Sequence, residues 1–590
     1  MSDTSQTQMD VDRDDDNQSG DQELGKVALT CLQVLFLPAT ESQVRPTSSE
    51  LWILCADWHN LRVCIKCKEE RAASRICLRT GKSVRLEEEV KTLKAQQTER
   101  LPSGSPRTDR AYSHSSPQWQ DGSPKWHGDE PLATTEPDLS LLSQATLCDL
   151  CDAWFEKYHP WFPILHKLSI LAVIQNSTTL VDSSLSIVLK AVIAVTLPHW
   201  SLSNPLSAVQ REQISTHFRS QVIMEAIGNL SLQSLQAVLI TTILDYGAGK
   251  LSEFWNLVAL CKKMGTQLGL RDLVANKGEN FNKLSTIPPR MLEMPTTLIE
   301  QEEMIRAYWM TEALDSISSL GAGWNLSLSR PENEVAFPCD ETVWAFPENA
   351  TAFSNFGDIE VSSTFSLYLN LVTQQVYQVH VFLQQSFDVA SAIDRVRRQA
   401  QCTFVDDGLI KWRHSTATTQ TLSQQCSASG STIVMITVTY DAAVISLYQR
   451  LALPPEGLGK VHGPWYHAIQ RSLSACDDMS MVLRALSDAD LESMSPHLIF
   501  CIFIAARFFI VHAKVLSVEI PRSVDLLVYA MKTCSQRWYL AKRLGKVLRH
   551  AIAEEKLPVA MSSLPHQFYD LQYSSLDIDA ALRAWADSSV

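Results

Sequence analysis

Residues 498–514 read Leu498-Ile-Phe-Cys-Ile-Phe-Ile-Ala-Ala-Arg507-Phe-Phe-Ile-Val-His512-Ala-Lys514, and they form the longest apolar run of the chain. Such a run approaches the length of a membrane-spanning helix. It also carries Arg507, His512 and Lys514, and ionisable side chains are costly inside a bilayer. We therefore interpret the run as a buried helix of a large α-domain and predict no contact with a membrane.

Apolar residues recur with a helical period in many other stretches between residue 139 and the end of the sequence. The clearest stretches are residues 141–155, 187–197, 232–244, 254–268, 304–320, 365–382, 433–453, 498–515 and 524–548. Alternation typical of strands is scarce. The sequence therefore predicts a mainly α fold, with one large all-α-helical domain over residues 139–590.

The charge of the chain is unevenly distributed. The formal net charge is −14, and residues 1–30 hold eight acidic side chains against two basic ones. Residues 55–85 instead hold eight basic side chains against three acidic ones, a local net charge of +5. A basic block in an acidic protein favours a small module that binds a polyanion.

The polar segments set the expected domain boundaries. Residues 1–26 are acidic and polar, which predicts a disordered tail. Residues 101–138 are rich in Pro, Ser, Gly and His, as expected of a flexible linker. The N-terminal residues do not read as a secretory signal, so we expect a reducing compartment in which most of the 14 cysteines are buried thiols.

Three cysteines lie in the basic block. Cys64, Cys67 and Cys77 form a C-x2-C-x9-C pattern. A two-residue gap lets a tight turn direct both thiolates at one Zn²⁺ ion. Chance placement of three cysteines is the alternative.

A short heptad follows the cysteines, within residues 84–100. Leu86, Val90 and Leu93 fall on one helix face at 4-3 spacing, with Glu and Lys residues around them. This pattern predicts a short coiled coil. A solvated amphipathic helix is the alternative, because two turns of apolar seam are marginal alone.

The order of basic cysteine module, heptad and linker resembles a fungal Zn(II)2Cys6 binuclear zinc cluster. Residues 27–83 would be its degenerate DNA-binding module, since Val27-Ala-Leu-Thr-Cys31 is similar to the approach to the first cysteine. The resemblance implies zinc held by four cysteines, Cys31, Cys64, Cys67 and Cys77. It implies phosphate contacts by six basic residues, Arg62, Lys66, Lys68, Arg71, Arg75 and Arg79. It further implies a nuclear homodimer that binds CGG-type half-sites in double-stranded DNA and acts on the transcription machinery.

Residues 32–61 depart from the family pattern. They lack a C-x-x-C pair and the Arg/Lys-rich helix that the family lays in the major groove. The pattern stops after Cys31 and resumes at Arg62. Two sharp boundaries favour a replaced segment, and our hypothesis is a translated intron or misassigned exon.

The helical domain resembles the fungal-specific transcription factor (middle homology) domain. The resemblance lies in five stretches taken in order: residues 155–166, 255–270, 303–324, 337–340 and 495–507. Glu303 and Arg306 are spaced to pair along one helix face. We assign Tyr308 and Trp309 to the core, because such aromatic side chains bury large areas.

Other candidate motifs favour structural roles. Cys148 and Cys151 form a second C-x2-C on a helical pattern, where core packing is the expected role. His159, His166 and His512 read as core histidines. We find no P-loop, no G-x-S-x-G and no H-E-x-x-H, so we expect no catalytic residues and no enzyme.

Two functions remain open from the sequence. The first is a DNA-binding regulator of RNA polymerase II genes, for which the resemblance suggests a metabolic gene cluster as the target. The alternative is a helical interaction protein that keeps the regulatory domain and does not bind DNA.

Overall fold

All regular elements in the described part of the chain are helices. The structure is a computed structural model that describes residues 138–176, 184–200, 206–275, 291–320, 335–346, 363–386, 388, 390–423, 430–453, 466–573 and 578–588. They all lie in one unit, Glu130–Val590. The prediction of a large α-helical domain is confirmed for these residues.

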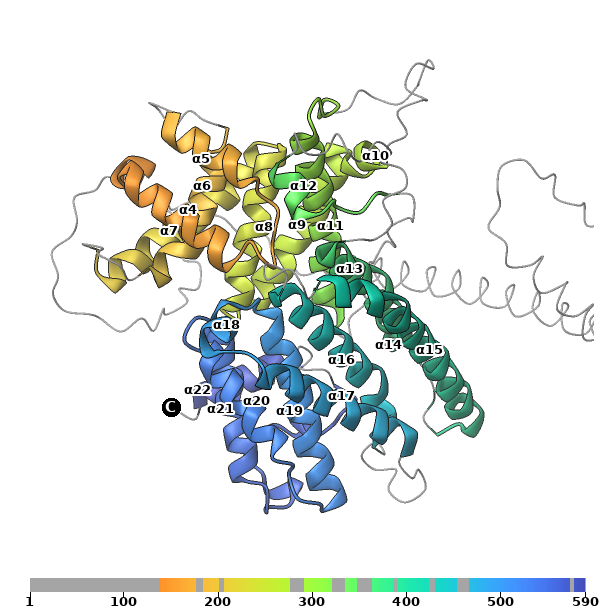
Figure 1. The fold of residues 1–590 in the computed structure, drawn as a ribbon. Coiled ribbons are helices and arrows are strands. Elements are labelled where there is room, and N and C mark those ends of the chain that lie inside the picture. The colour runs from red at the N-terminus through yellow and green to blue at the C-terminus, as the bar shows by residue number, and fades with distance from the viewer. Residues whose placement is uncertain are drawn as a thin grey trace, which may run out of the picture. The chain divides into compact units, whose positions relative to one another are not determined.

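The first half of the unit is built around helix α8 (Leu232–Gly247), which has 14 buried residues out of 16. A helix that is apolar on nearly every side belongs in the centre of a domain. Its main neighbours are α6 (Ser186–Thr196), α7 (Ala208–Gly228) and α9 (Leu251–Leu268). Around them lie α4 (Gln144–Lys157), α5 (Lys167–Asn176), α10 (Leu270–Val274), α11 (Leu298–Leu320) and α12 (Glu341–Ala345), as the orange to green part of Figure 1 shows.

The second half is built around α16 (Gly430–Ala452) and α19 (His497–Leu516), which pack against each other. Helices α15 (Ala392–Ser423), α17 (Tyr466–Arg484), α18 (Asp488–Ser493), α20 (Ser523–Cys534), α21 (Tyr539–Ala553) and α22 (Asp579–Ser588) surround this pair, in teal and blue in Figure 1. Helix α11 contacts the second half through α13 (Thr364–Asn370), the π-helical turn η5 (Leu371–Val376) and α14 (Tyr377–Gln384).

Helices α16 and α19 are long and apolar enough to cross a membrane, by length and composition only. Most of each helix is buried inside the unit. Arg507 in α19 is itself buried and donates to the carbonyl groups of Phe568, Tyr573, Gln567 and Asp570 at 2.7–3.0 Å. The interpretation of residues 498–514 as a core helix is confirmed.

Local sequence explains where several helices begin and end. Ser207 and Gln210 form a capping box at the start of α7, which satisfies two free backbone N–H groups. Gly269 ends α9 in the left-handed conformation with φ of 69°, which glycine adopts without strain. The predicted helical stretch 524–548 is two helices, because the chain turns at residues 535–538 between α20 and α21.

Candidate regulatory junction between the two halves

A buried segment without regular structure connects α4 to α5 and lies between the two halves of the unit. We call residues 159–166 the crossing segment; residues 161–166 are all buried. Pro160 and Pro163 supply no backbone N–H, and proline also disfavours a helix before it. The segment's carbonyl groups therefore need partners from elsewhere in the fold.

Side chains and carbonyls from four helices pair with the crossing segment. The hydrogen bonds are Thr432 Oγ1 of α16 to the Pro160 carbonyl at 2.7 Å, Arg306 of α11 to the Pro163 carbonyl at 3.1 Å, Gln236 of α8 to the Ile164 carbonyl at 3.0 Å, and Trp161 Nε1 to the Ser493 carbonyl of α18 at 2.8 Å. Because α8 and α11 belong to the first half and α16 and α18 to the second, these bonds hold the halves together.

Arg306 is the most heavily paired side chain of the junction and is fully buried. Its Nε donates to Glu302 at 3.0 Å, and its remaining groups donate to Glu341 and to the Cys339 carbonyl. The guanidinium also lies 3.9 Å from the centre of the Trp344 ring. Burial lowers the pKa of Arg306, but the two carboxylates outweigh this effect and raise it, so the side chain remains charged.

The expected pairing of Glu303 with Arg306 is wrong. Arg306 pairs with Glu302, four residues earlier in α11, because that carboxylate lies on the same helix face and also accepts from the Cys339 N–H at 3.0 Å. Glu303 instead accepts from the His166 backbone N–H at 3.3 Å. Burial raises the pKa of Glu303 to about 7, despite this hydrogen bond.

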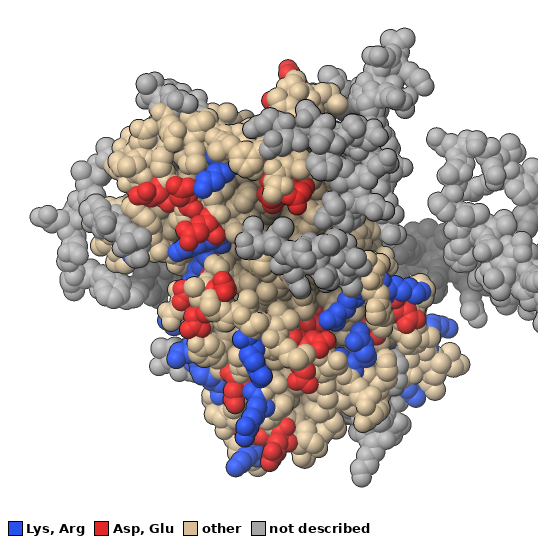
Figure 2. Space-filling model, viewed as in Figure 1, with Lys and Arg blue, Asp and Glu red and all other residues tan. Residues whose placement is uncertain are grey.

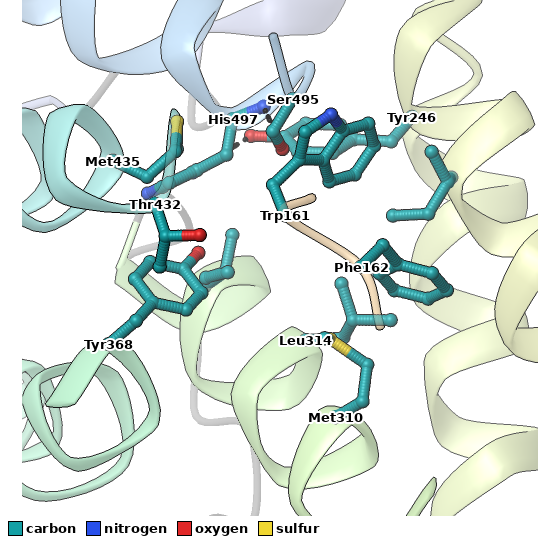
Figure 3. Close-up of a pocket in the computed structure, with 12 residues that line it drawn as sticks. Trp161, Phe162, Tyr246, Met310, Leu314, Tyr368, Thr432, Met435, Ser495 and His497 are labelled. Atoms are coloured by element: carbon teal, nitrogen blue, oxygen red, sulfur yellow. Dashed lines mark hydrogen bonds between the residues drawn. The ribbon is translucent and has the colours of Figure 1, made fainter. Parts of the chain in front are cut away.

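A small cavity lies next to the crossing segment (Figure 3). Trp161 and Phe162 line it from the segment, Tyr246 from α8, Tyr368 from α13 and His497 from the start of α19. Its volume of about 20 Å³ is enough for one water molecule. The cavity is therefore a gap at the meeting point of the halves, too small in this conformation for an organic ligand.

The polar groups of the cavity are uncharged. Tyr246 Oη and His497 Nδ1 lie 3.4 Å apart. Burial lowers the pKa of His497 to about 3, and burial raises the pKa of Tyr246 and of Tyr368. At neutral pH the cavity presents hydroxyl groups and a neutral imidazole, which suit water or an uncharged polar group rather than an ion.

Trp538 makes a second contact between the halves. Its Nε1 donates to the Met494 carbonyl at 3.0 Å, and its ring meets Tyr158 edge to face at 6.2 Å. The same ring covers Gly247 at the end of α8, where an added Cβ would lie 2.0 Å from Trp538 Cε3. Glycine is thus required at residue 247 by the close approach of the indole ring.

The junction holds no constellation for catalysis or metal binding. Within the described ranges, no group of three or more His, Cys, Asp or Glu side chains is placed to hold a metal ion. The charged groups of the junction are engaged in hydrogen bonds that join helices.

The prediction of buried thiols is confirmed for the described cysteines, and the prediction of core histidines is confirmed for His166 alone of the three. All eight described cysteines are free thiols and seven of them are buried, including Cys151, while Cys148 is half-buried on α4. His166 is buried with its Nδ1 2.7 Å from Ser169 Oγ. His159 and His512 are half-buried rather than core residues, since His159 faces Glu341 at the surface and His512 lies near the end of α19.

The residues predicted from the sequence to bind zinc or DNA lie outside the described part of the chain. These are Cys31, Cys64, Cys67 and Cys77, with Arg62, Lys66, Lys68, Arg71, Arg75 and Arg79. The predicted tail, the heptad and residues 101–137 of the linker lie outside it as well. All of them stay predictions.

Sequence reasoning missed the partners that complete the junction. Glu302, Glu341 and Trp538 were not singled out, although Glu302 stands at the i−4 position from Arg306, where a salt-bridge partner is expected. Nothing in the sequence pairs Trp538 with Gly247, which are distant along the chain.

Comparison with known proteins supports the resemblance seen in the sequence. Residues 151–414 match the family described as the fungal specific transcription factor domain. The chain is 29% identical over 460 residues to the "Notoamide biosynthesis cluster transcriptional coactivator notQ'" of Aspergillus versicolor, across 78% of this chain and 76% of that protein. No solved structure gives a significant match. The family match and the similarity to a transcriptional coactivator together support a fungal transcription regulator rather than an enzyme.

Proposed function

We propose that the chain is a nuclear, DNA-binding regulator of RNA polymerase II transcription. The observation that carries the proposal is the match of residues 151–414 to the fungal specific transcription factor domain. In this proposal the helical unit is the regulatory domain. It contacts the transcription machinery, and the junction holds its two halves in one arrangement.

Residues 27–83 are the proposed DNA-contacting module, with zinc held by the four cysteines named above. The local charge of +5 around Cys64, Cys67 and Cys77 supports contacts with phosphates. On the face shown in Figure 2, basic side chains of the helical unit lie among acidic ones and form no continuous basic surface. Homodimerisation through residues 84–100 and CGG-type half-sites complete the proposal.

The proposed target is a metabolic gene cluster. The relative's name assigns that protein to the biosynthesis cluster of notoamide. The extent of the similarity supports a comparable type of target here, with different genes.

A coactivator without its own DNA contact is the second candidate. Two observations favour it: residues 32–61 lack the C-x-x-C pair of the first half of a complete cluster, and the relative is named a coactivator. Such a protein would reach promoters through a DNA-bound partner.

The zinc content and the DNA affinity of the full-length chain separate the two candidates. Zinc bound to the chain and a shifted CGG-containing duplex support the DNA-binding regulator, and Cys67→Ala is then expected to abolish both. The affinity is expected to fall with log[salt] with a slope of about −0.9 per neutralised phosphate. Absence of zinc and of binding at low salt would reject the DNA-binding regulator.

A tethering assay tests the proposal common to both candidates. The chain fused to a heterologous DNA-binding domain is expected to change expression of a reporter gene. Arg306→Met, which disrupts the junction, is the matched loss-of-function control. A reporter that does not respond to the wild-type fusion would argue against a transcription regulator.

A further inference from the structure

Helix α15 lies at the edge of the helical unit (Figure 1) and exposes a regular stripe of residues. One face of α15 packs inward through Cys402, Leu409 and Trp412. On the opposite face, Ile393 and Phe404 are 73% and 79% exposed. Single exposed apolar side chains are common on protein surfaces, so the spacing and the charges of their neighbours decide whether this face binds a partner.

The exposed residues follow the spacing of a coiled-coil seam. We call the seam the α15 outer face; its members, at alternating intervals of four and three residues, are Ile393, Arg397, Ala400, Phe404, Asp407 and Lys411. All six are exposed. A 4-3 alternation keeps a narrow stripe on one side of a helix over several turns. The seam spans 19 residues, or about 28 Å of helix.

We propose that the α15 outer face binds the same face of a second copy of this chain, with the two helices antiparallel. In a twofold antiparallel pair centred on residue 402, Arg397 stands opposite Asp407 of the second copy, and Ala400 stands opposite its Phe404. Each layer thus pairs opposite charges or a large side chain with a small one. The remaining layer sets Ile393 against the aliphatic stem of Lys411, which can cover an apolar neighbour.

The charges of the seam select the antiparallel arrangement. In a parallel pair, Arg397 would face Arg397 and Asp407 would face Asp407, and like charges across an interface are strongly unfavourable. Arg397 pairs with Asp394 of its own helix at 3.3 Å, and its side chain is 67% exposed. An exposed pair of this kind contributes little, so it does not compete with a contact to a second copy.

The size of the seam sets the strength of the contact. A stable protein–protein interface uses about 800 Å² and about 20–30 residues on each side. A single helix face with six seam residues is smaller, so we infer a weak dimer that forms with rising concentration. The contact is separate from the predicted heptad of residues 84–100.

Charge reversal tests the pairing in the full-length chain. The parent for the test carries Leu86→Asp and Leu93→Asp, which remove the apolar seam of the heptad. In sedimentation velocity over a range of about 1–50 μM, this parent is expected to shift from monomer to dimer as concentration rises. Arg397→Asp or Asp407→Arg alone is expected to lower the association constant at least about tenfold, because each creates two like-charge layers.

Mixing the two single variants separates a specific pairing from a folding defect. In an equimolar mixture, the carboxylate introduced by Arg397→Asp in one chain would face the guanidinium introduced by Asp407→Arg in the other. The native Asp407 of the first chain would likewise face the native Arg397 of the second. Both charged layers would again pair opposite charges, so the mixture is expected to recover the dimer.

A matched control changes an exposed residue elsewhere in the second half. Tyr466→Asp removes an aromatic residue that is 69% exposed on α17 and is expected to leave association unchanged. A parent that stays monomeric, or a mixture that does not recover dimer, would overturn the proposal.

Discussion

Replacement of Gly247 by alanine is expected to destabilise the junction. A Cβ at residue 247 would lie 2.0 Å from Cε3 and 2.3 Å from Cζ3 of Trp538. These distances are far inside van der Waals contact, so the indole ring or the end of α8 must move. The ring cannot move freely, because Trp538 Nε1 is bonded to the Met494 carbonyl and Trp538 is only 2% exposed.

Two opposing effects set the size of the change. Overpacking of a filled core costs about 1–3 kcal/mol, and the severe overlap at Gly247 places this case near the upper end. Alanine favours a helix over glycine by up to about 1 kcal/mol, which offsets part of the cost. The net expectation is a loss of about 2 kcal/mol, or a decrease of about 2 °C in melting temperature for a unit of this size.

Gly228 at the end of α7 supplies the matched control. A Cβ there would meet nothing within 4 Å, and glycine-to-alanine changes at such positions stabilise by about 0.4–1 kcal/mol. Differential scanning fluorimetry and urea unfolding should therefore show opposite signs for Gly228→Ala and Gly247→Ala. Two changes of the same sign would refute the steric argument.

A double variant tests whether Trp538 is the cause. Trp538→Phe removes the outer ring that overlaps the added Cβ, so Gly247→Ala should cost at least about 1 kcal/mol less in this background than alone. Trp538→Phe also loses the hydrogen bond to the Met494 carbonyl. The quantity compared is therefore the change in unfolding free energy caused by Gly247→Ala in the wild-type chain and in the Trp538→Phe chain. Additive effects of the two substitutions would mean that the strain lies elsewhere.

Three further changes test other parts of the argument. Arg306→Met is expected to destabilise the unit by about 3–5 kcal/mol, because it leaves the Glu302 carboxylate buried without its cation; a loss below about 1 kcal/mol in urea unfolding would contradict this. Glu303 has a folded-state pKa of about 7, above the ordinary value of 4.5, so its contribution to stability falls as pH rises from about 4.5 to 7. Glu303→Gln should therefore gain up to about 3 kcal/mol relative to wild type between pH 5 and pH 8, and a pH-independent difference would argue against a buried carboxyl group. Leu86→Asp with Leu93→Asp should reduce the sedimentation mass to that of a monomer at sub-micromolar concentration, and an unchanged mass would show that the heptad does not form the dimer.

The helices that can be predicted from the sequence are those whose apolar composition alone indicates that they are buried. Helices α8 and α19 are buried on nearly every side, so their apolar runs are visible without any knowledge of their neighbours. Helix α15 is absent from the predicted stretches, because its buried face includes Arg398 and Asp406 and its exposed face includes Phe404. A helix with polar groups inside and apolar groups outside does not show the ordinary amphipathic pattern.

Only part of the junction can be predicted from the sequence, because its contacts join residues that are far apart along the chain. Pro160 and Pro163 indicate an irregular segment, and the sequence around them carries a recognisable motif. The partners of its carbonyl groups come from residues between 72 and 272 positions away in sequence. Pattern and spacing describe neighbours along one helix, so they identify Arg306 as important without revealing that Pro163 and Cys339 are what it binds.

The hydrogen bonds of the crossing segment also determine how the halves can respond to a signal. Thr432 and Gln236 reach the segment from opposite halves, and each bond that is left unmade in the core costs about 1–3 kcal/mol. If the two halves separated only in part, several of these hydrogen bonds would break. The freed polar groups would still be buried, so water could not replace the lost partners. Any second arrangement of comparable energy would therefore have to give these buried groups new hydrogen-bond partners. A regulatory signal that acts through this unit must supply that second set of contacts, because a signal that only weakens one bond leaves the others to hold the halves in place.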